Sequence, residues 1–180
     1  MNIAAQTVVS AGPTSAAGPV RPAAIASASI APSATTAPRT VAYPRDPKGG
    51  QIFGRLSIPA LKQTFPIVEG TSVADLKKGV GHFSRSVLPG ENDNCVLSGH
   101  RDTVFTRLGK LKIGDRFITQ TSVGTFTYQI RRIRIVHADD RTVIVHTDHA
   151  VLTVSTCYPF HYIGSAPDRY VLVADLVASQ

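Results

Sequence analysis

The sequence predicts a mainly β protein, a closed eight-stranded barrel with only short helices or 3-10 turns. Three observations lead to this prediction. From Phe53 onward, apolar residues recur in short runs that are separated by Pro and Gly, which is typical of strands joined by tight turns. Only one short stretch has a helix start signal. One long strand also changes the phase of its apolar pattern, as strands of small closed barrels often do.

The expected strands follow one another with little between them. They are 54–58, 65–68, 95–98, 116–121, 125–136, 142–145, 151–156 and 170–176. The helix is expected after Thr71 and Ser72, which are good capping residues, and runs through Lys78 with Leu76 facing the core.

The change of phase lies in the segment 125–136. Its apolar residues fall on even positions up to Ile130 and on odd positions from Ile133 onward. A strand with a period of two cannot keep both sets on one face. The pattern therefore predicts a β-bulge at Arg131 and Arg132.

Composition limits the classes of protein that the chain can belong to. At 180 residues it has room for one domain and a tail, and 43% of its residues are hydrophobic, enough for a core. The formal net charge is +7, but the basic residues are scattered. Their one cluster, Arg131, Arg132 and Arg134, is interpreted as a solvated strand face, so no nucleic-acid partner is expected.

The first 48 residues differ from the rest. They consist mainly of Ala, Ser, Thr and Pro and contain one acidic residue, Asp46. Such a stretch has few large side chains to bury, so residues 1–48 are expected to be a disordered tail or linker, and residues 49–180 the folded domain. We expect no membrane anchor in this chain, because it has neither a long apolar run nor the pattern of a secretory signal near Met1.

The chain contains two cysteines, too few for a disulfide framework. Cys95 begins an apolar run and is interpreted as a small buried hydrophobe. Cys157 instead follows the apolar run 151–156 and precedes a turn that contains Pro159. Backbone N–H groups that leave a sheet at such a point can hold an oxyanion. Position alone gives equal weight to a nucleophile and to a thiol that merely packs.

Six histidines are candidates to favour the thiolate of a cysteine nucleophile. His82 and His161 fall in loop-like contexts. His137, His146 and His149 flank a turn rich in aspartate. We interpret this turn as solvated rather than metal-binding, because no third ligand has suitable spacing.

The sixth histidine, His100, ends an apolar strand and is followed by Arg101 and Asp102. A rigid strand end can hold a reactive group where a loop exposes it. Arg169 stands at the start of the last strand, where a guanidinium can stabilise developing negative charge in a cleft. The alternative for Arg169 is a salt bridge, for example to Asp168.

These segments together resemble the sortase family. Sortases have Leu-Thr-x-x-Thr-Cys in the active-site strand, and here Leu152 to Cys157 matches it. The catalytic histidine of the family lies in a Gly-His motif, matched within Ser98 to Asp102. The family's arginine opens the strand after the cysteine loop, as in Ala166 to Tyr170.

The resemblance runs from about Gly54 to Ala174. The run Cys157 to Phe160, followed by Gly164 to Pro167, is most similar to class D sortases. The further matching segments are 54–59, 66–70, 79–82, 88–91 and 108–115.

The resemblance implies a sortase-type β-barrel and a cysteine transpeptidase with His100, Cys157 and Arg169 as catalytic residues. Cys157 would attack the Thr carbonyl of an LPxTG-like sorting signal, and His100 would protonate the leaving amine. Arg169 would bind the substrate backbone or the oxyanion. Thr156 and Ser98 are expected to bind substrate. An amine nucleophile would then resolve the thioacyl enzyme.

The implied partners are a secreted protein with a C-terminal LPxTG-like sorting signal and an amine acceptor, either a peptidoglycan precursor or a pilin lysine. The implied location is the extracytoplasmic face of the bacterial cell membrane. No cofactor or metal is expected, calcium included, because no acidic cluster matches a calcium site.

Two alternatives stay open: a cysteine peptidase that acts only as a hydrolase, and a catalytically idle barrel that binds sorting-signal-like peptides. An L,D-transpeptidase is disfavoured, because Ser155-Thr156-Cys157 does not match the Ser-x-Gly-Cys type of pattern.

Overall fold

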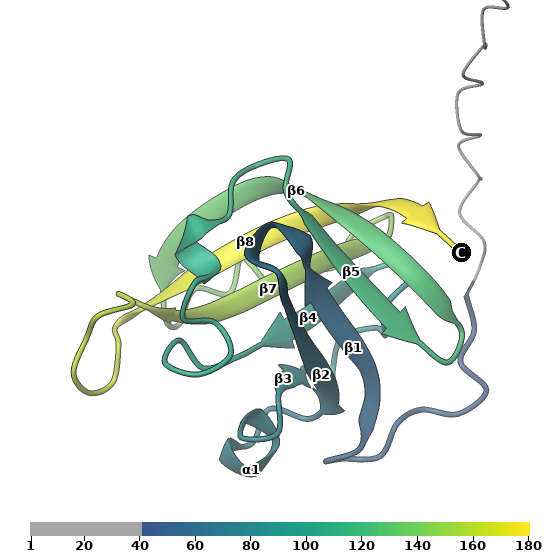
Figure 1. The fold of residues 1–180 in the computed structure, drawn as a ribbon, viewed down its shortest axis with the longest axis horizontal. Helices are drawn as coiled ribbons and strands as arrows, with labels where there is room; N and C mark the ends of the chain where they lie inside the picture. Colours follow the sequence, from purple (N-terminus) through teal and green to yellow (C-terminus); the bar gives the residue numbers. More distant parts are fainter. Residues whose placement is uncertain (1–40) are drawn as a thin grey trace, which may run out of the picture. The chain divides into compact units, whose positions relative to one another are not determined.

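Eight strands close into a β-barrel in the computed structural model, which describes residues 41–180 (Figure 1). The strands are β1 (Ile52–Ile58), β2 (Gln63–Glu69), β3 (Val80–His82), β4 (Asn94–Ser98), β5 (Arg116–Thr121), β6 (Gly124–His137), β7 (Val151–Tyr158) and β8 (Asp168–Ser179). Their order around the barrel is β1-β2-β3-β4-β7-β8-β6-β5, with β5 pairing back onto β1. The pairs β2–β3 and β4–β7 are parallel, and the others are antiparallel. The mainly β closed barrel predicted from the sequence is confirmed.

One predicted strand is wrong and another was missed. Residues 142–145 form no strand; the Asp140 side chain instead accepts hydrogen bonds from the N–H and the hydroxyl of Thr142, at 2.7 and 2.6 Å, which stabilises a turn. Ile144 and Val145 are both about half exposed, so their β-branched side chains have no sheet to pack on. Conversely, β3 has only three residues with a glycine in the middle, too short for an alternating pattern to show.

The predicted bulge is confirmed. The register between β6 and β8 shifts between Ile130 and Arg132. The two strands nevertheless pair from Phe126 with Ser179 to His137 with Asp168. The bulge therefore lets one long strand bend around the barrel and still reach the end at which β8 begins.

The predicted helix is present but shorter than expected. The helix α1 covers Val73–Leu76, and Ser72 caps it by accepting a hydrogen bond from the N–H of Asp75, whose carboxylate bonds back to Ser72. Gly81 of β3 leaves room for the helix, because a Cβ there would lie 2.7 Å from a methyl group of Leu76. Two 3-10 turns accompany it, η1 (Pro59–Leu61) and η2 (Leu108–Lys110).

Large apolar side chains fill the inside of the barrel. The largest that are almost fully buried are Tyr128, Phe105, Phe117, Phe126, Leu56, Ile58, Ile67, Leu97, Leu108, Ile130, Leu152 and Leu172. Cys95 belongs to the same core and is 1% exposed, which confirms its interpretation as a buried hydrophobe. Alternation along each strand turns the neighbours of these residues outward.

Tyr43 joins the first described residues to the barrel. Its hydroxyl donates to the carbonyl of Pro89 at 2.7 Å and lies 3.1 Å from the Thr121 hydroxyl, and burial raises the pKa of its phenol. The disorder expected for residues 1–48 falls mostly on residues 1–40, which lie outside the described residues. Within 41–180, no helix is both long and apolar enough to cross a membrane.

Candidate active site

The parallel pairing of β4 with β7 brings two of the predicted site residues to the same end of the sheet. Ser98 is the register partner of Ser155, and the N–H of Gly99 still bonds to the carbonyl of Ser155 at 3.2 Å. His100 and Cys157 each lie two residues beyond this last paired level. Because neighbouring strands lie roughly 4.8 Å apart, the backbones that carry them are adjacent.

Arg169 comes from the other neighbour of β7. In the antiparallel pair β7–β8, Cys157 and Arg169 are direct register partners. The arginine's Nη1 donates to the carbonyls of Ala166 and Asp168, at 3.2 and 2.9 Å. Within residues 41–180 it has no carboxylate at ion-pair distance, contrary to the salt bridge considered as its alternative. The backbone thus holds one edge of a half-buried guanidinium beside the cysteine.

The two predicted substrate-binding residues have different surroundings. Thr156 is buried, and its hydroxyl donates to the carbonyl of Gly99 at 2.7 Å. This hydrogen bond joins β7 to the residue just before His100. Ser98 is half-buried and its hydroxyl lies 3.1 Å from that of Ser155. Thr156 therefore faces the barrel interior, whereas the serine pair lies on the opposite face of the sheet.

Close packing explains why the Gly-His motif has a glycine at position 99. A Cβ at Gly99 would lie 2.6 Å from the ring of Phe105 and 2.6 Å from a methyl group of Val104. Phe105 is 1% exposed, and its N–H bonds to the carbonyl of His100 at 3.0 Å. A glycine at position 99 thus lets the chain after β4 turn back against the core and hold His100 at the strand end.

The two thiols differ in access, which gives a first prediction. Cys157 is half-buried, whereas burial, together with the nearby Glu91 and Glu69, raises the pKa of the Cys95 thiol. Since the thiolate is the reactive form, iodoacetamide is expected to label the native protein once, at Cys157, and the denatured protein twice. Peptide mapping by mass spectrometry checks this, and labelling of Cys95 in the native protein at a similar rate would contradict the burial.

Three exposed histidines pair with aspartates. His137 contacts Asp139, His146 contacts Asp93, and His149 contacts both Asp148 and Asp175. The hydrogen bond to Asp139 raises the pKa of His137, and the one to Asp148 raises that of His149. Across residues 41–180, no group of three or more His, Cys, Asp or Glu side chains could hold a metal ion.

His82 does not lie in a loop, as its context had suggested, but ends β3. It is 2% exposed, and its Nδ1 lies 2.6 Å from a carboxylate oxygen of Glu69, its register partner in β2. Its Nε2 donates to the carbonyl of Val87 at 3.0 Å, and the ring of Phe53 packs edge-on against it. The parallel pairing of β2 with β3 buries this pair, and no local pattern of residues indicated that pairing.

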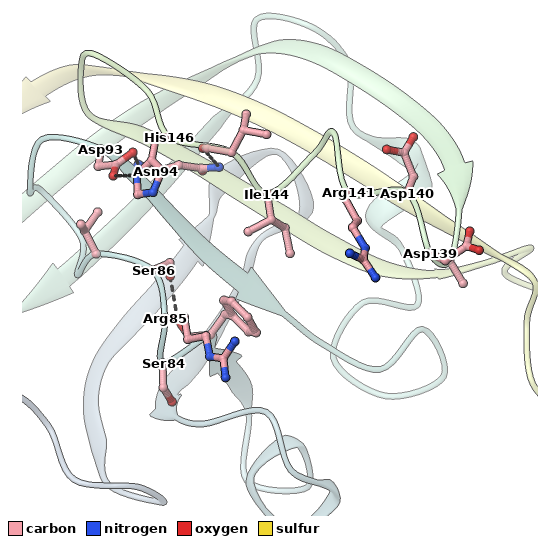
Figure 2. A pocket seen from close by; sticks show the side chains of 14 residues that line it. Ser84, Arg85, Ser86, Asp93, Asn94, Asp139, Asp140, Arg141, Ile144 and His146 are labelled. Atoms are coloured by element: carbon pink, nitrogen blue, oxygen red, sulfur yellow. Dashed lines mark hydrogen bonds and ion pairs between the residues drawn. The ribbon is translucent and has the colours of Figure 1, made fainter.

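Two chain segments wall a groove of about 840 Å³ beside the sheet (Figure 2). One wall is formed by 83–87 with Asp93 and Asn94, and the other by 138–146 of the connection between β6 and β7. Residues Cys95, Leu97, Leu152 and Val154 point into the core. By alternation, the outward positions of β4 and β7, which include Ser98, Ser155 and Cys157, form a row from this groove toward the strand ends.

A polar latch fixes the far end of the groove. Asp93 accepts from the N–H of Thr147 at 2.7 Å and contacts Nδ1 of His146 at 2.6 Å. Asn94 donates to the carbonyl of Val145 at 3.1 Å and accepts from the hydroxyl of Thr153 at 2.7 Å. Burial alone would raise the pKa of Asp93, but the bonds from His146, Thr147 and Asn94 lower it. The groove and its latch were not foreseen, since they join segments about fifty residues apart.

Comparison with known proteins agrees with this arrangement. The family model described as "Sortase domain" matches residues 56–177. Sortase D of Bacillus subtilis is 49% identical over 127 residues, and Sortase A of Bacillus anthracis is 24% identical over 134 residues. The chain spans 64% and 62% of the length of these two relatives and is matched over 70% and 72% of its own.

Solved structures give the same result. The catalytic domain of SrtD from B. anthracis has a TM-score of 0.64 and 48% identity, covering 77% of this chain and 95% of that one. A structure described as a Clostridium perfringens Sortase D5 transpeptidase has a TM-score of 0.66 and 29% identity, covering 74% of this chain and 83% of that one. The chain is a member of the sortase family, and it is more similar to Sortase D than to Sortase A.

Proposed function

We propose that this chain is a cysteine transpeptidase that cleaves an LPxTG-like sorting signal after its Thr and transfers the acyl group to an amine. One observation carries the proposal: Cys157 is the register partner of Arg169 and lies next to the extension of β4 that carries His100. A nucleophile, a proton carrier and a fixed cation are the groups that acyl transfer requires.

The proposed chemistry has two balanced halves. The thiolate of Cys157 attacks the Thr carbonyl carbon, Arg169 stabilises the oxyanion, and the C–N bond breaks as His100 protonates the leaving amine. The amine of the acceptor then attacks the thioester, the C–S bond breaks, and the acceptor's proton returns to His100. Water in place of the amine gives hydrolysis.

The groove supplies a site for the acyl donor. Thr153 lies four residues before Cys157 in β7, about 13 Å at the usual rise of a strand. An extended peptide whose Thr carbonyl meets Cys157 would then place its preceding residues over the outward row and in the groove. Ser98, with Ser155, would line the floor of this path. Thr156 would act through Gly99 as a positioning residue for His100.

The substrate, acceptor and location follow the family. The acyl donor would be a secreted protein with a C-terminal sorting signal, and the acceptor a peptidoglycan precursor or a pilin lysine. These reactants place the reaction at the cell envelope, on the outer face of the membrane. Residues 49–180 would form the catalytic domain, and residues 1–48 a linker.

The proposal is tested by comparing transfer of the acyl group to an added amine with its transfer to water. The full chain is incubated with LPxTG-like peptides, with and without an added amine such as triglycine or diaminopimelic acid, and the products are identified by mass spectrometry. A ligated product that grows with amine concentration at the expense of the hydrolysed one is expected, because both arise from one thioacyl intermediate. Cleavage that gives the same products with and without the amine would favour the hydrolase. Peptide binding without any product would favour the idle barrel.

A further inference from the structure

Two arginines face the groove without a partner. Arg85 comes from the wall formed by 83–87 and Arg141 from the opposite wall, and both side chains are exposed (Figure 2). Neither has a hydrogen bond or a carboxylate at ion-pair distance within residues 41–180. Arginine that is exposed on two opposed walls and left unpaired is suited to an anionic group that enters between them.

The carboxylates that line the same groove are already engaged. Asp93 is held by His146 and Thr147, and Asp139 contacts His137. Asp140 accepts from Thr142 and lies 3.6 Å from Arg134. The carboxylates of the groove therefore already have partners, whereas its two arginines have none within residues 41–180 and stay open to an added anion.

The connection that carries Arg141 begins close to the start of β8. Arg141 follows Asp139 and Asp140, close to the end of β6, and the N–H of Ala138 bonds to the carbonyl of Pro167 at 2.9 Å, one residue before β8 begins. Ala138, which lines the groove, thus lies beside the start of β8, the strand that carries Arg169. A peptide chain spans about 16 Å in five extended residues, so a donor whose Thr carbonyl meets Cys157 can extend its preceding residues toward the groove.

We propose that Arg85 and Arg141 make the groove select acyl donors with an acidic side chain among the five residues that precede the scissile bond. This inference rests on the proposed transpeptidase function and names the charge of its substrate. The chain's own first 45 residues contain no Asp or Glu, so they offer the arginines no partner. Ile144, on the same wall as Arg141, adds an apolar surface for the residue beside the acid.

Two sets of three peptides test the selection. They carry Glu, Gln or Lys either at the x position or at the residue before the Leu, so that the LPxTG-like signal itself is kept. At low salt, kcat/KM is expected to be about tenfold higher for the best Glu peptide than for its Lys counterpart, with Gln between them. At 0.5 M NaCl the ratio is expected to shrink to about twofold, because the interaction is exposed.

Charge reversal supplies the matched controls. The double variant Arg85→Glu with Arg141→Glu is expected to prefer the Lys peptide. The variant Arg116→Glu, at the exposed first residue of β5 and outside the lining of the groove, is expected to keep the preference for Glu. Loss of preference in Arg116→Glu as well would assign the effect to net charge and overturn the role of the two arginines. Native-state protection of Cys95 from iodoacetamide shows that each variant is folded.

Binding to the variant Cys157→Ala, measured by fluorescence anisotropy with the same peptides, separates the two proposals. Preference for Glu in binding, without cleavage by the unmodified chain, would leave the charge selection standing and overturn the transpeptidase. Amine-dependent cleavage in which the Glu and Lys peptides differ by less than twofold would leave the transpeptidase standing and overturn the selection. If the protein shows neither a preference for Glu nor amine-dependent cleavage, both proposals are overturned.

Discussion

Replacing Cys157 by alanine is expected to abolish product formation, with kcat/KM falling by at least about 10⁴-fold. The thiol sulfur is the atom that would form the covalent intermediate. Removing a catalytic nucleophile usually lowers the catalytic rate by this factor or more. The barrel should remain intact, because Cys157 is only half-buried and lies at the end of β7. Peptide cleavage followed by mass spectrometry measures the effect.

The second cysteine provides the control for this experiment. Cys95→Ala removes a thiol from the core and is expected to lower the free energy of unfolding by about 1–2 kcal/mol while leaving the catalytic rate within about threefold. A peptide chloromethyl ketone, which alkylates a reactive thiol, should attach one inhibitor molecule to the unmodified chain and none to the variant Cys157→Ala. Residual turnover of Cys157→Ala above a hundredth of the original rate would reject Cys157 as the nucleophile.

Replacing His82 by alanine is expected to have the largest effect on stability, with the free energy of unfolding falling by about 3–5 kcal/mol. The change would leave the Glu69 carboxyl, which is 7% exposed, without its partner at 2.6 Å. It would also remove the hydrogen bond to Val87 and the edge contact with Phe53. Urea unfolding measures the loss, which corresponds to a fall in melting temperature of more than about 10 °C.

An exposed pair on the same protein is the matched control. His137 and Asp139 also contact each other, but their side chains are 67% and 83% exposed. His137→Ala is therefore expected to change the free energy of unfolding by less than about 0.5 kcal/mol. The double variant Glu69→Met with His82→Leu should recover at least half of the loss, because no polar group is then left buried. A cost below about 1 kcal/mol for His82→Ala would contradict the account.

The fold was predictable where local patterns are strong. The phase slip near Ile130 revealed the bulge, and Ser72 revealed the start of α1. The failures involve short segments whose state depends on distant partners. β3 exists because β2 and β4 flank it, whereas Val143–Val145 has strand-like residues but no edge to join.

The candidate site was predictable to a different degree. The motifs around Cys157 and Arg169 lie at the ends of strands that the sequence already indicated, and the resemblance grouped them with His100 as one catalytic set. Glu69 with His82, and Asp93 with His146, could not be found, because each pair is brought together only by strand register or by a long connection. A histidine in an otherwise apolar stretch was the only available signal for His82.

The parallel pairing of β4 with β7 also bears on the order of folding. These strands are 57 residues apart between Ser98 and Ser155, and the intervening chain must build β5 and β6 before the barrel can close. Contacts so distant in sequence form late and slowly. A refolding chain would therefore bury Cys95 and bring His100 next to Cys157 in one late step. Pulse alkylation of Cys95 during refolding, with the accessible Cys157 as an internal reference, would time the formation of this strand pair.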